Sequence, residues 1–99
     1  MAPPPSDNLQ KMQTGNWYTC LTDELESLRQ TARAAVHQHN TQHPDQRGNV
    51  APLLRSAFAQ CPDTAFLEAP FHCAYGFNIR FGENSYLNAG CTILDTAHV

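Results

Sequence analysis

The chain has 99 residues, of which 41% are hydrophobic and 15% are charged, with a formal net charge of −3. This composition predicts one small globular domain with a core of marginal size. Six Lys and Arg residues without a cluster argue against a nucleic-acid partner, which requires many phosphate-neutralising cations. No apolar run approaches the roughly 20 residues of a membrane span, and the first residues lack the pattern of a signal peptide. We therefore expect a cytoplasmic protein without a membrane partner.

The beginning of the chain predicts a leader followed by helices. Residues 1–6 are rich in proline and predict a disordered leader, whereas residues 7–60 predict a helical domain. A short helix is expected over residues 7–14. Trp17 and Tyr18 follow it directly, and we expect both aromatic side chains to pack in the core rather than to form a binding surface.

The strongest helical pattern covers residues 23–39. Apolar side chains recur there at three- and four-residue spacing, as on the buried face of a helix. Asp23 and Glu26 resemble a capping-box pair at its start. His37 and His39 lie at its end, where we expect them to be solvated and to compensate the helix dipole.

A third helix is expected over residues 49–60, with Pro52 tolerated in its first turn. From residue 61 the pattern changes to short extended pieces, and residues 61–99 predict strands rather than helices. The predicted fold class is α+β, with the helical segment first and the strands after it.

Four apolar residues recur at six-residue intervals near the end of the sequence: Phe81, Leu87, Ile93 and Val99. Neither a helix nor a flat strand has this period, which is typical of a β-helix. Three such hexads make one triangular coil of eighteen residues. Fewer than about three repeats do not bury a solenoid core, so we expect a truncated β-helix and a chain that is the N-terminal part of a longer protein.

The four cysteines show no metal-binding spacing. An eighteen-residue coil would stack Cys73 on Cys91, close enough for a disulfide, although a reducing compartment favours free thiols. Among the histidines, His39 and His43 have helical i,i+4 spacing, but the helix is expected to end between them. No metal site is predicted.

Four segments of the sequence are characteristic when taken together. Residues 12–18, 71–79, 82–84 and 88–95 read MQTGNWY, FHCAYGFNI, GEN and NAGCTILD. In this order and spacing they resemble the maltose and galactoside O-acetyltransferases, from about residue 9 to residue 99. The resemblance implies a homotrimer of left-handed parallel β-helices. It also implies transfer of an acetyl group from acetyl-CoA to a sugar hydroxyl, in sites between neighbouring subunits.

The resemblance also implies roles for five positions. Asn88 matches an asparagine that contacts the acceptor and stabilises the oxyanion, a task that requires a fixed hydrogen-bond donor. Tyr86 resembles an aromatic residue of the acceptor pocket, and Asp95 matches a carboxylate near that pocket. Cys20 stands where relatives carry an acceptor-binding carboxylate, and Ala74 replaces a polar pocket residue. Three of these positions also have a plain structural interpretation: Asn88 as a corner residue, Asp95 as a solvated turn acid and Tyr86 as a packed side chain.

The general base that deprotonates the acceptor is best supplied by histidine. The resemblance places the catalytic histidine beyond residue 99, and His98 does not match it. Most of the acetyl-CoA site is also expected outside this sequence, so the chain alone is predicted to be inactive. Two other interpretations remain: a non-catalytic interaction module that docks on a partner β-helix subunit, and a thiol or metal protein based on Cys73, Cys91 and the histidines.

Overall fold

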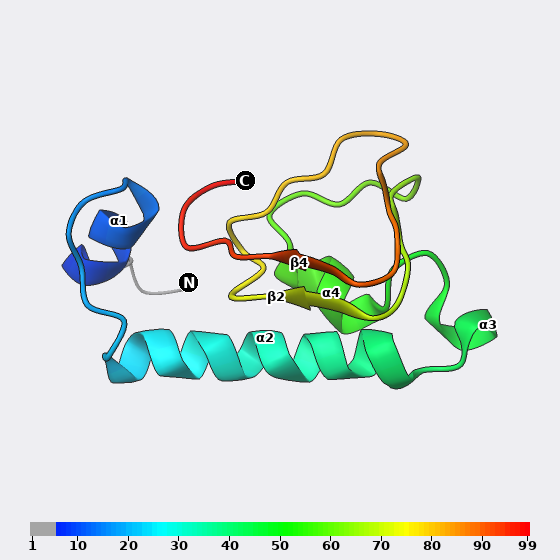
Figure 1. Cartoon of the computed structure of the whole chain (residues 1–99), viewed down its shortest axis with the longest axis horizontal. Coiled ribbons are helices and arrows are strands. Elements are labelled where there is room, and N and C mark those ends of the chain that lie inside the picture. The colour runs from blue at the N-terminus through cyan, green and yellow to red at the C-terminus, as the bar shows by residue number, and fades with distance from the viewer. Residues whose placement is uncertain (1–5) are drawn as a thin grey trace.

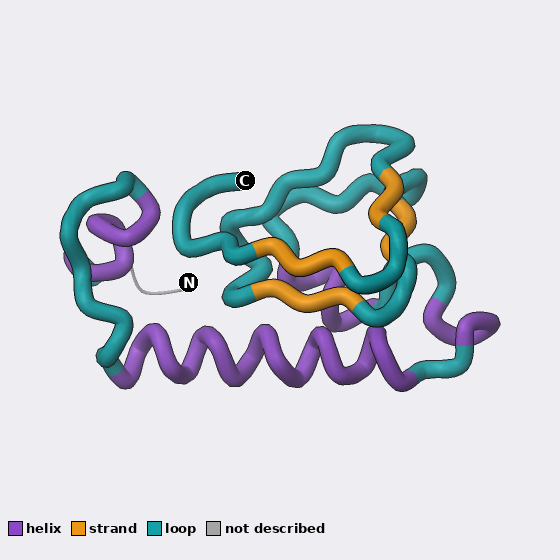
Figure 2. The backbone as a smooth tube through the Cα atoms, in the orientation of Figure 1, coloured by secondary structure: helices purple, strands orange, loops and turns teal. Residues whose placement is uncertain are grey.

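A computed structural model describes residues 6–99 as an α+β fold, in which helices precede short strands (Figure 1, Figure 2). The helices of this part of the chain are α1 (Asp7–Gln13), α2 (Asp23–Thr41), α3 (Pro44–Arg47) and α4 (Pro52–Ala57), and the strands are β1 (Phe66–Leu67), β2 (Phe71–Cys73), β3 (Tyr86–Leu87) and β4 (Cys91–Ile93). Figure 1 shows α2 running beneath β2 and β4, with α1 beyond one end of the strands. None of the helices described is long and apolar enough to cross a membrane.

The first helix begins at Asp7, as predicted, but its N-cap lies within the predicted leader. Ser6 is the N-cap of α1, and its Oγ accepts a hydrogen bond from the backbone N–H of Leu9 at 3.1 Å. Its assignment to a disordered leader was therefore wrong, because a serine hydroxyl satisfies one of the free N–H groups of a helix start. The rest of the predicted leader, residues 1–5, lies outside the described residues.

The long helix α2 is confirmed, but its cap is Thr22 rather than Asp23. The Thr22 Oγ1 accepts from the Leu25 backbone N–H at 3.2 Å, and Asp23 occupies the first helical position. A carboxylate there still favours the helix dipole. Glu26 does not complete a capping box, because its carboxylate pairs with Arg29 and with a second arginine further along the helix.

The predicted third helix is shorter than expected. It is represented by α4, which begins at Pro52 and ends at Ala57. Phe58 already has extended backbone angles, and the next residue, Ala59, donates its N–H to the Ile79 carbonyl at 2.9 Å. The chain thus leaves the helix in order to pair with a later segment. The single turn of α3 was not predicted; Pro44 at its start pre-sets the helical φ angle.

The strands pair in parallel at a constant separation along the chain. Phe66 lies opposite Tyr86 in the β1–β3 pair, Phe71 lies opposite Cys91 in the β2–β4 pair, and Gln60 forms a bridge with Arg80. Partners are therefore 20 residues apart in all three places, and the predicted coil of eighteen residues was wrong. The chain therefore returns alongside itself, in the same direction, after 20 residues.

The longer coil also changes the neighbours of the cysteines. Cys73 lies opposite Ile93, not opposite Cys91, and all four cysteines are free. Burial raises the pKa of the Cys73 thiol to about 12, so this group is not a reactive thiolate at neutral pH. The interpretation as a thiol protein based on this pair loses its support.

The burial of side chains in the core confirms most of the predicted six-residue spacing. Phe81 is buried in the main core, and Leu87 and Ile93 pack against it, whereas Val99 is 59% exposed. Phe58 stands edge-on to the rings of Phe81 and of a phenylalanine in β2, with centroids 5.0 and 5.9 Å apart. Aromatic pairs in this geometry add to the stability that burial provides. A second, smaller cluster joins α1 to α2 and to the segment after β2; its buried members are Leu9, Met12, Leu25 and Tyr75.

His39 is fully buried, which contradicts the expected solvated position at the end of a helix. Its Nδ1 accepts from the Ala51 backbone N–H, and its Nε2 lies 3.1 Å from the Leu67 carbonyl oxygen. One neutral imidazole therefore joins α2 to the start of α4 and to β1. Burial, and secondly the charge of Arg47, lower the pKa of His39 below its ordinary value of 6.5.

We expect the stability of the protein to fall as the pH drops from 6.5 to 5.5. The unfolded chain binds a proton on this histidine at a higher pH than the folded chain, so acid favours the unfolded state. Urea unfolding at a series of pH values measures the effect. H39Q is expected to be less stable at pH 8 and to lose this pH dependence, whereas H37Q, on an exposed position of the same helix, is expected to keep it. If the free energy of unfolding of H39Q fell with decreasing pH as steeply as that of the wild type, His39 would not be the group responsible.

Candidate functional site

A hollow of about 650 Å³ lies between the α1–α2 connection and the segment that follows β4. Its volume is in the range of small-molecule binding sites. The lining contains apolar, hydroxyl, thiol and amide groups but no charged side chain: Met12, Gly15, Asn16, Trp17, Tyr18, Cys20, Thr96 and Ala97. Two segments about 80 positions apart in the sequence thus form opposite walls of one site.

The aromatic residues of the first wall do not pack as expected. The Trp17 side chain is 97% exposed and that of Tyr18 is 36% exposed, so the prediction of a buried Trp17 was wrong. The backbone of this connection is held instead. Asn8 on α1 donates its amide to the Thr19 carbonyl at 2.8 Å and accepts from the Thr19 N–H at 3.1 Å. A held backbone lets the indole project into solvent beside the hollow.

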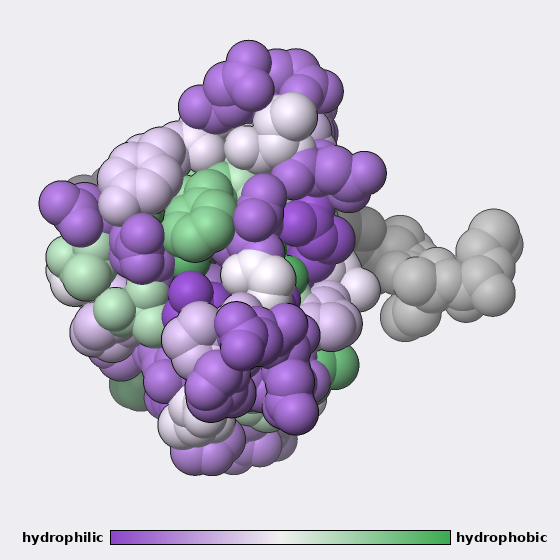
Figure 3. All heavy atoms as spheres, turned by 90° about the vertical axis from the view of Figure 1, so that its right-hand side faces the viewer, coloured by the Kyte–Doolittle hydropathy of each residue, from purple (hydrophilic) through white to green (hydrophobic). Residues whose placement is uncertain are grey.

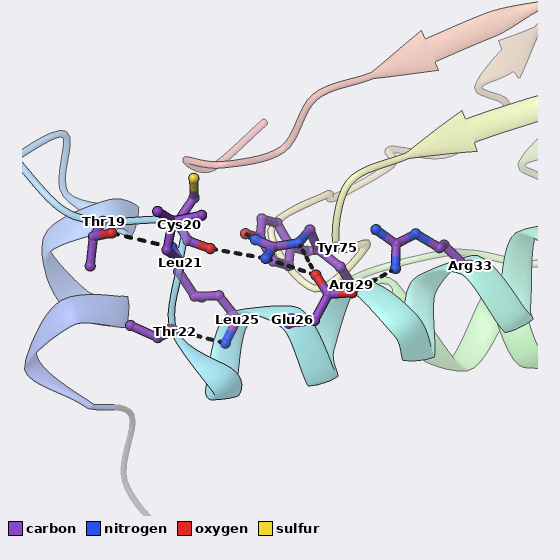
Figure 4. A network of polar contacts seen from close by, with 9 residues as sticks. All are labelled: Thr19, Cys20, Leu21, Thr22, Leu25, Glu26, Arg29, Arg33 and Tyr75. Atoms are coloured by element: carbon purple, nitrogen blue, oxygen red, sulfur yellow. Dashed lines mark hydrogen bonds and ion pairs between the residues drawn. The ribbon is translucent and has the colours of Figure 1, made fainter.

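Arg29 on α2 ties the first wall to the rest of the molecule (Figure 4). Its guanidinium donates to the Cys20 carbonyl at 2.9 Å, to the Tyr75 hydroxyl at 2.9 Å and to the Glu26 carboxylate at 2.9 and 3.0 Å. Hydrogen bonds from Arg33 and then from Arg29 lower the pKa of Glu26. The hydrogen bonds that Arg29 donates to Glu26 in turn raise the pKa of Arg29, which therefore remains a permanent cation. The sequence did not single out Arg29, because nothing in its spacing distinguishes it from an ordinary helix-surface arginine.

Asp95 shapes the loop that follows β2. Its carboxylate is fully buried and accepts the backbone N–H groups of Tyr75 at 2.8 Å, Gly76 at 2.8 Å and Asn78 at 3.2 Å. Gly76 has a φ of +89°, a conformation that side chains disfavour, and an added Cβ would lie 3.3 Å from Ala57. The structure places this carboxylate beside the hollow rather than in its lining, and the next residue along the chain, Thr96, lines the hollow instead.

Asn78 holds the second wall in place. Its Nδ2 donates to the carbonyls of Asp95 at 2.8 Å and Thr96 at 3.3 Å, and its Oδ1 accepts from the Gln13 side chain at 2.9 Å. The buried amide therefore connects the end of α1 with the segment after β4. Thr96 and Asn78 were missed as site residues; Thr96 adjoins the characteristic NAGCTILD segment, which was the one signal available.

The other predicted site residues lie outside the lining of the hollow. Tyr86 is 58% exposed, stacks on Phe66 at 5.8 Å and donates its hydroxyl to Glu68 at 3.0 Å, a bond that raises the pKa of Tyr86. Asn88 is exposed, and its Oδ1 accepts from the N–H of the next residue at 2.8 Å. Ala74 packs against the smaller core cluster. Figure 3, which looks at the right-hand side of Figure 1, where α3 lies, shows small hydrophobic patches among polar side chains.

The histidines do not gather at one place. His39 lies in the core, whereas His37 and His72 line a shallow hollow of about 270 Å³ with Arg33, Val36 and Asn40. Among residues 6–99 there is no group of three or more His, Cys, Asp or Glu side chains placed to hold a metal ion.

Comparison with known proteins gives consistent matches over both parts of the chain. Residues 11–62 match the family described as "Maltose acetyltransferase hexapeptide capping motif". Nodulation protein L of Rhizobium meliloti is 33% identical over 90 residues, which is 91% of this chain and 49% of that protein.

Two solved structures resemble the fold as a whole. The maltose O-acetyltransferase of Clostridium difficile 630 superposes with a TM-score of 0.86 and 26% identity, over 92% of this chain and 49% of that one. A galactoside acetyltransferase in complex with coenzyme A gives a TM-score of 0.81 and 26% identity, over 95% and 47%. The chain thus spans about half the length of the proteins that it matches.

We expect the substitution D95N to lower the free energy of unfolding by about 2–3 kcal/mol, because it removes the charge and one acceptor from a buried group that serves three N–H donors. D63N is the matched control, since the Asp63 carboxylate is solvent-exposed and its ion pair with Arg55 is worth little. Urea unfolding of both variants measures the difference. A loss in D95N no larger than in D63N would show that Asp95 does not organise the loop.

Proposed function

The chain belongs to the maltose acetyltransferase family defined by its hexapeptide capping motif, and we propose that it forms the N-terminal part of an acetyl-CoA-dependent O-acetyltransferase acting on a sugar hydroxyl. The observation that carries the proposal is the agreement of two independent features. The family motif covers residues 11–62, and the parallel ladders with a constant separation cover the rest. A free-thiol protein of this kind fits a cytoplasmic location.

We further propose that the strands begin a left-handed parallel β-helix and that the intact protein is a homotrimer. Within residues 6–99, β3 and β4 each pair on one side only, so their outer edges are available to a further coil. Leu94 is 73% exposed near that edge. A next coil would bury such side chains, as stacking does in solenoids.

The reaction needs three groups around the acceptor. A sugar oxygen attacks the thioester carbonyl carbon, a general base takes the hydroxyl proton, and the tetrahedral oxyanion collapses to release coenzyme A as its thiol. Asn88 is the proposed donor to the oxyanion or acceptor, since its Oδ1 is occupied by the Ala89 N–H and its Nδ2 is left to donate. We propose that Cys20, which lines the hollow with Thr96, belongs to the acceptor side, whereas Asn88 lies outside that lining. No histidine or carboxylate lines this hollow, so the base is expected from outside residues 1–99.

A second candidate function is a non-catalytic interaction module. The one-sided pairing of β3 and β4 favours it too, because an open strand edge accepts a further strand from a partner. Sedimentation of the purified chain distinguishes the candidates. A well-ordered monomer at all concentrations would count against a module that seeks a partner edge.

We expect the 99-residue chain to release no thiol from acetyl-CoA above background in the presence of a sugar acceptor. A chimera is expected to gain this activity when the chain is joined to the part of the Clostridium difficile maltose O-acetyltransferase beyond the matched 49%. A thiol-reactive dye measures release, and the sugar-free reaction is the control. A folded chimera that binds coenzyme A but transfers no acetyl group to any sugar would contradict the proposed function.

In the same chimera, N88A and N88D are both expected to reduce kcat by about 100-fold, the usual cost of losing one oxyanion donor. Aspartate retains an oxygen for the Ala89 N–H and so preserves the turn, but it cannot donate. T92A, at an exposed position on β4, is the control and should keep its activity. Full activity of N88D would limit Asn88 to a role in the turn.

A further inference from the structure

Arg47, the last residue of α3, is a buried cation without a counter-ion in the part of the chain that the structure describes. It is 9% exposed and belongs to none of the ion pairs within residues 6–99. Its side chain makes one hydrogen bond there, from Nε to the Gly48 carbonyl at 3.4 Å, so both Nη atoms have no acceptor. Removing a charge from water is costly unless the charge meets a partner.

The other arginines of the chain are treated differently by the fold. Arg29, Arg33 and Arg55 pair with carboxylates, and Arg80 is exposed to water. Each of them therefore has either a counter-ion or solvent around its charge. Arg47 is the one arginine within residues 6–99 that is both buried and unpaired, which indicates that its guanidinium serves a ligand.

The side chains around Arg47 do not neutralise its charge. The buried His39 is close enough for the charge of Arg47 to contribute to its lowered pKa, and this imidazole is neutral at pH 7. Asp45 precedes Arg47 on α3, but its side chain is 91% exposed and lies 3.7 Å from His43 instead. The corner between α2 and α4 thus contains a buried cation that has no paired carboxylate.

The unpaired nitrogens of Arg47 can be reached from solvent. Among the described residues, the Oε1 of Gln42 is the fully enclosed side-chain polar atom without a hydrogen-bond partner. The Nη atoms of Arg47 also have no partner, but they are not enclosed in this way, so they reach the surface. Burial restricts the rest of the side chain, and a ligand therefore has little side-chain freedom left to immobilise.

We propose that Arg47 binds a phosphate group, free or as a monoester, which accepts hydrogen bonds from both Nη atoms. The planar guanidinium matches two phosphate oxygens in a bidentate arrangement. The second negative charge of phosphate strengthens the attraction relative to a carboxylate. Arg47 does not line the hollow at Cys20, so the site goes beyond the proposed acetyl transfer, and its test needs no acetyl-CoA.

Urea unfolding of the full chain at neutral pH measures binding, because a ligand of the folded state raises the unfolding midpoint. Ionic strength is kept constant with sodium chloride. We expect the midpoint to rise with inorganic phosphate and to rise less with acetate at the same concentrations. An equal rise with phenyl phosphate would support a site for monoesters, and a rise with inorganic phosphate alone would support a site for the free ion.

Three variants test the residue itself. R47M is expected to fold, because it replaces an unpaired buried charge by an apolar side chain of similar length, and to lose the response to phosphate. R47K retains the charge but not the bidentate geometry, and should need about tenfold more phosphate for the same rise. R47K carries the test alone if R47M does not fold. R80M is the matched control, since Arg80 is exposed, and should respond as the wild type does.

A second measurement reports where the anion binds. A phosphate at Arg47 would cancel part of its charge, so the pKa of His39 should rise with phosphate, whereas the exposed His37 should change little. Proton NMR of the imidazole signals over a series of pH values measures both groups. R47M should show no such rise at His39, because the charge that phosphate would cancel is already absent.

Three results would overturn the inference. An equal rise of the midpoint in the wild type and in R47M would show a general salt effect. No response of the wild type to phosphate, or an equal response to acetate, would exclude a phosphate site. Self-association of the wild type that R47M abolishes, without any response to phosphate, would show that Arg47 pairs with a carboxylate of a second copy instead.

Discussion

The arrangement of the strands and of the hollow depends on one buried carboxylate. Asp95 accepts three backbone N–H groups of the loop after β2, including those of Tyr75 and Asn78. Without a fixed acceptor, the N–H groups of this loop would be buried and unpaired, which is costly. The carboxylate thereby fixes the conformation of the loop that follows β2.

Residues of the same loop form hydrogen bonds that connect it to both walls of the hollow. The Tyr75 hydroxyl accepts a hydrogen bond from the Arg29 guanidinium, which also donates to the Cys20 carbonyl. The Asn78 side chain donates to the Thr96 carbonyl. The helix α2 therefore supports the site through Arg29 at one end and supports the core through the buried His39 at the other. The long helix α2 runs beneath the strands, with α1 beyond one of its ends and α3 beyond the other, as Figure 1 shows.

The amino-acid sequence predicted those parts of the fold that depend on periodic burial. The stripe of α2 and the inward positions of Phe81, Leu87 and Ile93 follow from spacing alone, because each reflects one face turned to the core. The length of the coil did not follow, because the strict six-residue spacing from Phe81 to Val99 predicts eighteen residues, whereas paired residues are 20 apart. The burial of His39 was missed because the dipole argument considers only its own helix and not the chain that packs across it.

The site was predictable only in part, for a related reason. Resemblance pointed to Cys20, which does line the hollow, whereas Trp17 was expected in the core and Thr96 was not considered. The two walls are far apart in the sequence and are connected through tertiary hydrogen bonds of Gln13, Arg29 and Asn78. The spacing of these three residues in the sequence does not predict such contacts.

Under the proposed function, the lining of the hollow can contact an acceptor but cannot supply its general base. The lining contains no histidine or carboxylate, the side chains best suited to take the proton of a sugar hydroxyl. The base that we propose is therefore expected from outside residues 1–99. Within residues 6–99, β3 and β4 each pair on one side only, and a further strand can add to those edges.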